Sequence, residues 1–112
     1  MKIYVTGLGV VSGIGIGVSE NIEALRQRKH GIGKVTLFPT ALDVPVSEVK
    51  RSNEELKQLI SLPPQRTVSR TALLGMIAAE EAMKDAGLTP SITYRFYFRH
   101  FRWRHGFERA LL

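Results

Sequence analysis

The residue types that most often perform covalent catalysis are scarce in this sequence. None of its 112 residues is a cysteine, so the chain has no thiol nucleophile, no disulfide and no thiolate metal ligand. Its three histidines are His30, His100 and His105. His30 precedes Gly31 at the expected end of a helix, and we interpret it as a dipole partner or solvated loop residue rather than a ligand.

Three acids near the end of a long apolar stretch could suggest paired carboxylates. Glu80 and Glu81 are adjacent, so they diverge by about 100° around a helix and cannot share a proton or a metal ion. Glu81 and Asp85 do share a helix face, at i,i+4 spacing, with Lys84 beside them. We expect this face to be solvated.

A glycine-rich loop, residues 7–17, could suggest a dinucleotide site. That fingerprint needs a third glycine where this chain has Ser12, and an acid about 20 residues further on. Here Glu20 and Glu23 come too early, inside the next helix. We therefore interpret Gly7 and Gly9 as a tight connection within a packed core.

The last 21 residues differ in composition from the rest of the chain. Of the overall net charge of +6, residues 92–112 supply most, with five arginines against Glu108 alone. Seven of the nine aromatic residues also lie there. Arginine interleaved with aromatic rings, as in residues 94–105, is typical of a nucleic-acid surface, where guanidinium groups bind phosphate and rings stack on bases.

The remaining composition is that of an ordinary α/β chain. The apolar fraction is 44%, and no apolar stretch approaches the roughly 20 residues that span a bilayer. We expect no membrane contact. The lack of cysteine fits a cytoplasmic protein.

Strand, loop and helix patterns alternate along residues 3–87, which favours the α/β class. An apolar run from Ile3 to Val11 predicts a buried strand. A first helix is expected over residues 19–28, with Ser19 as its N-cap and with Ile22 and Leu25 facing inward. Short extended pieces are expected over residues 34–49.

Two further helices have clear start and stop signals. Ser52 and Glu55 resemble a capping box ahead of an apolar stripe formed by Leu56, Leu59 and Ile60, and Pro63 ends that helix. The clearest element spans residues 68–86, with Leu73, Leu74 and Ile77 at helical spacing and Gly87 as its C′ residue. Its small residues would let a neighbouring element approach closely: Ala72, Gly75, Ala78, Ala79 and Ala82.

Three stretches together resemble the opening of the β-ketoacyl-acyl-carrier-protein synthases of the elongating type, members of the thiolase-like superfamily. Residues 5–12 are similar to the family's VTG-x-G-x-x-S strand and loop. Residues 25–32 resemble its L-x-x-G-x-S/H-G-I stretch, and residues 78–88 its A-x-E-A-L-x-D-A-G-L helix end. The resemblance covers residues 3 to about 91. It implies the N-terminal part of a layered α/β/α/β/α fold, with residues 1–91 as a partial domain.

The resemblance also implies a reaction for which this chain lacks the residues. Family members join an acyl group to a malonyl unit by decarboxylative Claisen condensation, using a cysteine at a helix N-terminus and two histidines. None of these residues can be placed here, because there is no cysteine and His30 matches no catalytic position. We therefore assign no catalytic, cofactor-binding or metal-binding residue and expect no cofactor. Acyl carrier protein and a homodimer partner are the partners that the resemblance implies.

Residues 92–112 depart from the family, which has small and glycine residues at this point. Read one base later, codons for residues 97–112 admit Ile-Ser-Ala-Thr-Ser-Val-Gly-Gly and a further eight residues that resemble the family's continuation. We hypothesise that this segment is an out-of-frame tail.

Three expectations follow for the 112-residue chain. It is a truncated condensing enzyme that is inactive by itself, its parent acting in fatty-acid, polyketide or aryl-polyene synthesis. Its apolar residues, among them Val10, Leu73, Leu74 and Ile77, lose most of their packing partners, so the product is poorly soluble or molten. The alternative function is a small basic nucleic-acid-binding module built on residues 92–112, which we consider the weaker interpretation.

Overall fold

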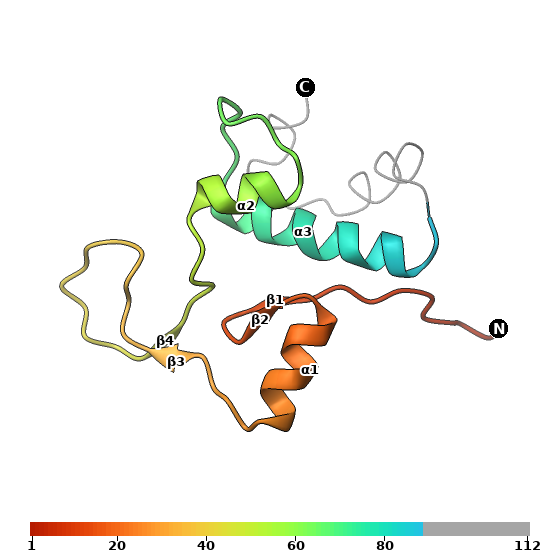
Figure 1. Cartoon of the computed structure of the whole chain (residues 1–112), viewed down its shortest axis with the longest axis horizontal. Helices are drawn as coiled ribbons and strands as arrows, with labels where there is room; N and C mark the ends of the chain where they lie inside the picture. The colour runs from red at the N-terminus through yellow and green to blue at the C-terminus, as the bar shows by residue number, and fades with distance from the viewer. Residues whose placement is uncertain (89–112) are drawn as a thin grey trace.

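The computed structural model of the chain describes residues 1–88, and residues 89–112 lie outside the described part. In this part the order of elements is β1 (Val11–Ser12), β2 (Gly15–Ile16), α1 (Val18–Arg26), β3 (Ile32–Gly33), β4 (Val46–Ser47), α2 (Asn53–Leu59) and α3 (Arg70–Asp85). The strands form two short antiparallel pairs, β1 with β2 and β3 with β4. Figure 1 shows α2 lying against α3, with the N-terminal residues passing along α3 on another side. The chain is therefore a small α/β arrangement centred on α3.

Helix α3 begins and ends where the sequence predicts. The Ser69 hydroxyl accepts a hydrogen bond from the Ala72 N–H at 3.2 Å and caps the N-terminus. At the other end Gly87 has φ of 70°, and the Leu88 N–H donates to the Met83 carbonyl at 2.9 Å. Glycine adopts this left-handed conformation without a Cβ clash, so it closes the helix in a Schellman motif.

The core is the contact between α2 and α3. Leu56 and Leu73 are fully buried, and Ile77 lies against them at 8% exposure. The expectation that Leu73 and Ile77 would lack packing partners is therefore wrong, because α2 supplies them from within the chain. Leu59 is instead 53% exposed and does not join the apolar stripe as expected.

The capping box at the start of α2 is confirmed. The Ser52 hydroxyl accepts from the Glu55 N–H at 3.2 Å, and the Ser52 N–H donates to the Glu55 carboxylate at 2.7 Å. The Ser52 N–H is the main reason why the pKa of Glu55 lies below its ordinary value of 4.5, and Arg51, 3.4 Å away, adds to the effect. The ionised form of Glu55 is thus favoured in the folded chain.

This shift predicts a pH dependence at the start of α2. A lowered folded-state pKa stabilises the cap above the unfolded-state pKa, and that stabilisation is lost as the pH falls through the lowered value. We expect amide exchange at Ser52, corrected for its intrinsic rate, to accelerate as the pH falls below about 4.5. Glu55→Gln should lack this acid transition. Identical pH profiles for the two proteins would contradict the assignment.

Helix α1 differs from its sequence prediction in both its cap and its buried face. The N-cap is Gly17 at φ 97°, and Ser19 lies within the first turn. Asn21 and Ala24 are buried, while Ile22 and Leu25 are 43% and 65% exposed. The reason is that the hairpin of β1 and β2 packs on the Asn21 side, and no described element covers the opposite side.

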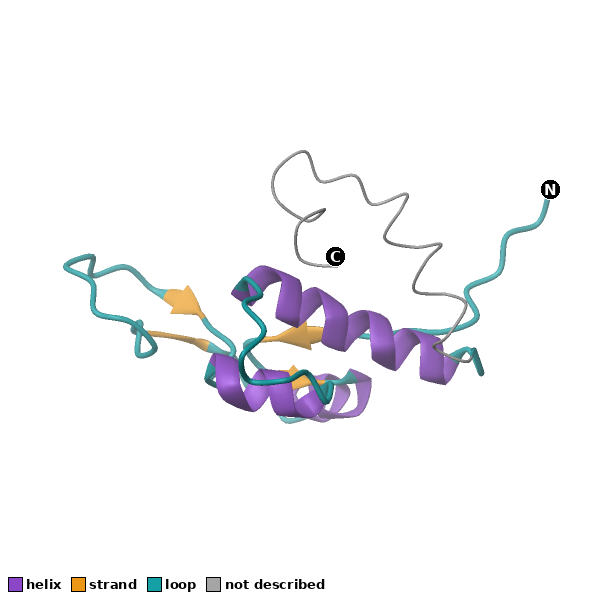
Figure 2. Cartoon of the chain, turned by 90° about the horizontal axis from the view of Figure 1, so that it is seen from above, coloured by secondary structure: helices purple, strands orange, loops and turns teal. Residues whose placement is uncertain are grey.

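The predicted buried strand over residues 3–11 is also not found as expected. Only Val11 of this run belongs to a strand, paired with Ile16, and Ile3 and Val5 are about four-fifths exposed, at 83% and 79%. A strand becomes buried when neighbouring strands pair with it and helices cover it. Within residues 1–88, α3 is the element alongside this run, so one of its sides is open (Figure 2).

Residues 32–47 form an arm that leaves the body of the molecule. Ile32 pairs with Ser47 and Gly33 with Val46, and a long loop joins the two strands. The extended pieces predicted over residues 34–49 are present in strand form only as β4. Pro39 and Pro45 lie in the loop, where proline cannot break a ladder hydrogen bond.

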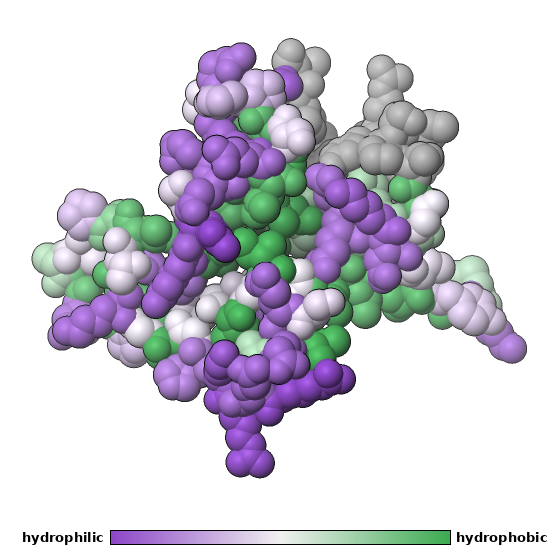
Figure 3. Space-filling view, in the orientation of Figure 1, coloured by the Kyte–Doolittle hydropathy of each residue, from purple (hydrophilic) through white to green (hydrophobic). Residues whose placement is uncertain are grey.

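Apolar side chains remain widely exposed over the described residues. Fourteen large hydrophobic side chains are exposed, whereas six hydrophobic residues form the core. Figure 3 shows apolar surface across the middle of the face and along the N-terminal segment. Because so small a core gives little cooperative stability, we expect the thermal transition of the 112-residue chain, followed by circular dichroism, to be broad. A sharp two-state transition would contradict this.

No helix among residues 1–88 combines the length and hydropathy that crossing a membrane requires.

Candidate functional site

The most specific arrangement in the described residues is the contact between the N-terminal segment, residues 3–10, and α3. At Gly7 an added Cβ would lie 2.1 Å from the Ala82 carbonyl oxygen, and at Gly9 it would lie 1.8 Å from the Ala78 carbonyl oxygen. Neither position can hold a side chain without moving one backbone from the other. The glycines of this loop thus allow a backbone-to-backbone contact, as the packed-core interpretation predicted.

Two acids of α3 hold the same segment by its backbone. The Leu8 N–H donates to the Asp85 carboxylate at 2.9 Å, and the Val10 N–H donates to the Glu81 carboxylate at 3.0 Å. The second Glu81 oxygen accepts from the Val18 N–H at 2.7 Å, at the first residue of α1. The expectation that this helix face is merely solvated is wrong, because it accepts hydrogen bonds from three backbone N–H groups.

The spacing of these contacts follows from the geometry of the two elements. Two residues of extended chain advance about 6.6 Å, and four residues of α-helix advance about 6 Å. Gly7 and Gly9 can therefore match Ala82 and Ala78, while Leu8 and Val10 match Asp85 and Glu81. The segment runs antiparallel to α3, with its glycines on the helix and its N–H groups at the acids.

Asn21 is the buried polar side chain that organises the β1–β2 hairpin. It is 8% exposed, and its amide nitrogen donates to the Gly15 and Gly17 carbonyls at 2.9 and 2.7 Å. Its carbonyl oxygen accepts from the Ser12 hydroxyl. Sequence reasoning missed Asn21, although a polar residue on the inward side of an amphipathic helix is a usable signal.

Arg70, the first residue of α3, is a second residue that sequence reasoning missed. Its guanidinium donates to the Val49 and Arg51 carbonyls, the latter at 2.9 Å, and to the Asn53 side chain at 3.0 Å. These bonds tie the chain before α2 to the start of α3. Arg70 thus has a structural role.

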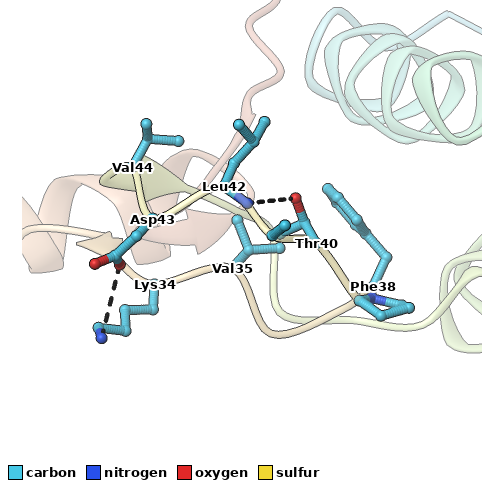
Figure 4. Close-up of a pocket in the computed structure, with 9 residues that line it drawn as sticks. Lys34, Val35, Phe38, Thr40, Leu42, Asp43 and Val44 are labelled. Atoms are coloured by element: carbon cyan, nitrogen blue, oxygen red, sulfur yellow. Dashed lines mark hydrogen bonds and ion pairs between the residues drawn. The ribbon is translucent and has the colours of Figure 1, made fainter.

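Neither of two hollows in the described part of the chain assembles catalytic groups. One, of about 520 Å³, lies between the start of α1, the end of α2 and α3, with Leu59, Ile77 and the Glu80–Lys84 ion pair in its wall. The other, of about 330 Å³, is the inside of the exposed 34–44 loop, where Lys34 and Asp43 pair at 3.7 Å (Figure 4). Both are open to solvent.

The residues first considered for chemistry do not come together. His30 is exposed beyond the end of α1. Within residues 1–88 no three His, Cys, Asp or Glu side chains are grouped so as to hold a metal ion. His100, His105 and the arginine-aromatic run lie outside the described residues.

These features define a class of chain: an α/β segment whose specific contacts position backbone rather than reactive groups. The family model of the β-ketoacyl synthase N-terminal domain matches residues 1–95, and the chain belongs to that family. The condensing enzymes of this family are of the acyltransferase type, which agrees with the resemblance of residues 3 to 91. No curated protein and no solved structure matches the chain.

Proposed function

We propose that this chain is the N-terminal core segment of a thiolase-like β-ketoacyl-acyl-carrier-protein synthase and that the 112-residue polypeptide does not catalyse condensation by itself. One observation carries the proposal. The chain belongs to a family whose resemblance implies a cysteine nucleophile, and it contains no cysteine. No other described group is placed to replace the thiolate, because His30 is solvated and the acids Glu81 and Asp85 bind backbone.

The reaction proposed for the parent enzyme explains why the thiolate is indispensable. A cysteine thiolate attacks the acyl thioester on acyl carrier protein, forms an acyl-cysteine thioester and releases the carrier thiol. Decarboxylation of malonyl-acyl-carrier-protein then gives carbon dioxide and an enolate. The enolate carbon attacks the acyl-cysteine carbonyl, and the thiolate leaves as the β-ketoacyl product forms. In both steps a bond between the acyl carbon and that sulfur is formed or broken.

In such an enzyme, this chain would form the N-terminal part of the packed core. Glu81 and Asp85 of helix α3 hold the N-terminal segment by hydrogen bonds to its backbone. Acyl carrier protein as the substrate carrier, a homodimer partner and the cytoplasm as the location belong to the same proposal. The absence of cysteine is compatible with that compartment.

We further propose that residues from about 97 onward are read out of frame. Support comes from the shifted reading of codons 97–112 and from the family match, which ends at residue 95. Sequencing the gene across these codons tests it. We expect the shifted frame to encode the continuation that contains Gly-Gly and to run on beyond it without a stop codon. A shifted frame that lacks this continuation would contradict the proposal.

The activity test is the release of carbon dioxide from malonyl-acyl-carrier-protein in the presence of an acyl-thioester donor. We expect the purified 112-residue chain to release no more than a blank without protein. A full-length condensing enzyme is the positive control. Carbon dioxide release that scales with the concentration of this chain would contradict the proposal.

A further inference from the structure

One side chain joins the two segments by which the chain enters and leaves the arm of residues 32–47. Glu48 follows β4, and its carboxylate oxygen Oε1 accepts from the Thr36 N–H at 2.8 Å and from the Thr36 hydroxyl. Continued for three more pairs, the register of β3 and β4 would place Thr36 opposite Asp43 instead. The start of the loop therefore leaves the register of the hairpin and bends back to Glu48.

Strand pairing cannot hold this part of the loop. The next pair in the register would be Lys34 with Pro45, and proline has no N–H to donate to the ladder. Two other polar contacts lie inside the loop: the Leu42 N–H donates to the Thr40 hydroxyl at 3.1 Å, and Lys34 pairs with Asp43 at 3.7 Å (Figure 4). The bonds to Glu48 thus connect the loop to the chain beyond β4.

The backbone on either side of Glu48 is anchored to the body of the molecule. Before it, Ser47 packs against the β1–β2 turn so closely that an added Cβ at Gly13 would lie 2.0 Å from the Ser47 Oγ. After it, the Val49 carbonyl accepts from the Arg70 guanidinium of α3. Glu48 therefore has a fixed backbone position from which its side chain reaches the loop.

We propose that Glu48 and Thr36 form a latch that holds the start of the loop when Glu48 is ionised and releases it when Glu48 is protonated. Hydrogen bonds to an ionised carboxylate are roughly twice as strong as those between neutral groups. Once Glu48 is neutral, water competes for the N–H and the hydroxyl of Thr36. The loop then loses its connection to the chain beyond β4, and the hollow that it encloses changes shape. This conformational device is independent of the condensing function proposed above.

The charges around the latch favour the closed state at neutral pH. The Thr36 hydroxyl is the main reason why the pKa of Glu48 lies below its ordinary value of 4.5, and nearby backbone N–H groups and the charge of Lys50 lower the pKa further against the opposing effect of desolvation. Lys34 and Asp43 are the charged side chains of the arm itself, and they pair with each other. A lowered folded-state pKa stabilises the latch above the unfolded-state pKa, and that stabilisation is lost as the pH falls through the lowered value.

Amide exchange of the wild type, corrected for intrinsic rates, measures the latch directly. The Thr36 N–H is held by the carboxylate of Glu48, whereas the Leu42 N–H in the same loop is held by a hydroxyl that does not titrate in acid. Between about pH 6 and about pH 3 the protection of Thr36 should fall about threefold or more, and that of Leu42 should stay constant. A constant protection of Thr36, or the same loss at both amides, would overturn the proposal.

Two variants that remove the same charge separate the two acids of this region. Glu48→Gln keeps one acceptor oxygen but cannot titrate, so the acid transition at the Thr36 amide should disappear. Asp43→Asn breaks the pair with Lys34 and should keep the transition. Helix content from circular dichroism checks that both variants keep the wild-type fold. A transition that persists in Glu48→Gln, or one that is lost in Asp43→Asn, would contradict the assignment.

Trypsin at neutral pH tests whether the latch restrains the arm. Lys34 is the only lysine or arginine between Lys29 and Lys50, so cleavage after it reports on the loop, and its rate follows the population of the open form when opening is fast. Relative to peptides of the same local sequence, Thr36→Val and Glu48→Gln should each be cleaved about twofold or more faster than the wild type. The double variant should be cleaved no faster than the faster single variant, because both changes remove one contact. Wild-type cleavage rates in the single variants, or additive effects in the double variant, would overturn the proposal.

Discussion

Replacing Gly9 with alanine is expected to lift the N-terminal segment off α3. The new Cβ would lie 1.8 Å from the Ala78 carbonyl oxygen and 2.8 Å from the Ala82 nitrogen. Both are backbone atoms of a helix, which cannot rotate away as a side chain can. Overpacking of this kind typically costs about 1–3 kcal/mol, and here it also lengthens the hydrogen bond from Val10 to Glu81. Exchange at the Leu8 and Val10 amides should accelerate by about 30- to 100-fold, near the upper part of that range.

Gly75→Ala provides the matched control within α3. An added Cβ at Gly75 meets no atom within 4 Å outside the helix itself, and the residue has ordinary helical geometry. Alanine there should stabilise the helix by about 0.5–1 kcal/mol. Both substitutions replace glycine with alanine, but we expect Gly9→Ala to destabilise the fold and Gly75→Ala to stabilise it. A Gly9→Ala protein with wild-type exchange at Leu8 and Val10 would show that the close contact with α3 does not hold.

Replacing Glu81 with glutamine is expected to loosen both ends of the β1–β2 hairpin together. Glu81 accepts from Val10 before the hairpin and from Val18 after it, at 3.0 and 2.7 Å. Glutamine keeps one acceptor oxygen and turns an NH₂ group toward the other donor. A hydrogen bond to a charged group contributes about 1.5–3 kcal/mol, so we expect a loss of about 2 kcal/mol. Exchange at both amides should accelerate by about 30-fold.

The adjacent substitution Glu80→Gln removes the same charge without touching the hairpin. Glu80 pairs with Lys84 at 2.7 Å near the surface, and exposed pairs at i,i+4 spacing contribute only about 0.3–0.5 kcal/mol. Exchange at Val10 and Val18 should stay within about twofold of the wild type. If the two variants behave alike, the effect comes from net charge and the assigned hydrogen bonds are not responsible.

Local signals in the sequence were sufficient for α2 and α3. Ser52 with Glu55, and Gly87, act on backbone groups within about one turn, so their meaning does not depend on distant elements. Ser69 caps α3 in the same local way but was not predicted. Ile77 lies four residues after Leu73 and three after Leu74, and this helical spacing indicated the buried face of α3. Helix α3 lies within two residues of its predicted bounds, whereas α2 ends at Leu59, before the Pro63 that was expected to end it.

The N-terminal segment shows where local reasoning fails. Ile3 and Val5 have the residue types of a buried strand, but burial depends on which elements surround a strand, and the described chain provides only α3. The same holds for Ile22 and Leu25 of α1, whose apolar side meets no described neighbour. In both places the sequence pattern matches a larger core than residues 1–88 contain.

The role of Glu81 and Asp85 was not evident from their own positions either. On a helical wheel they form an ordinary solvated face. Their partners are backbone N–H groups more than 60 residues away, which leave no mark in the side-chain pattern. The usable clue is shared spacing, because the G-x-G of the segment and the four-residue repeat of Ala78 and Ala82 advance by nearly the same length.

The central proposal is that this polypeptide, which belongs to a condensing-enzyme family and contains no cysteine, is not acylated by an acyl thioester. Intact-protein mass spectrometry after incubation with an acyl thioester tests it most directly, because the first step of the family's reaction leaves the acyl group on the protein. We predict that the mass of the 112-residue chain stays unchanged. A stoichiometric, hydroxylamine-labile gain of one acyl group would contradict the account.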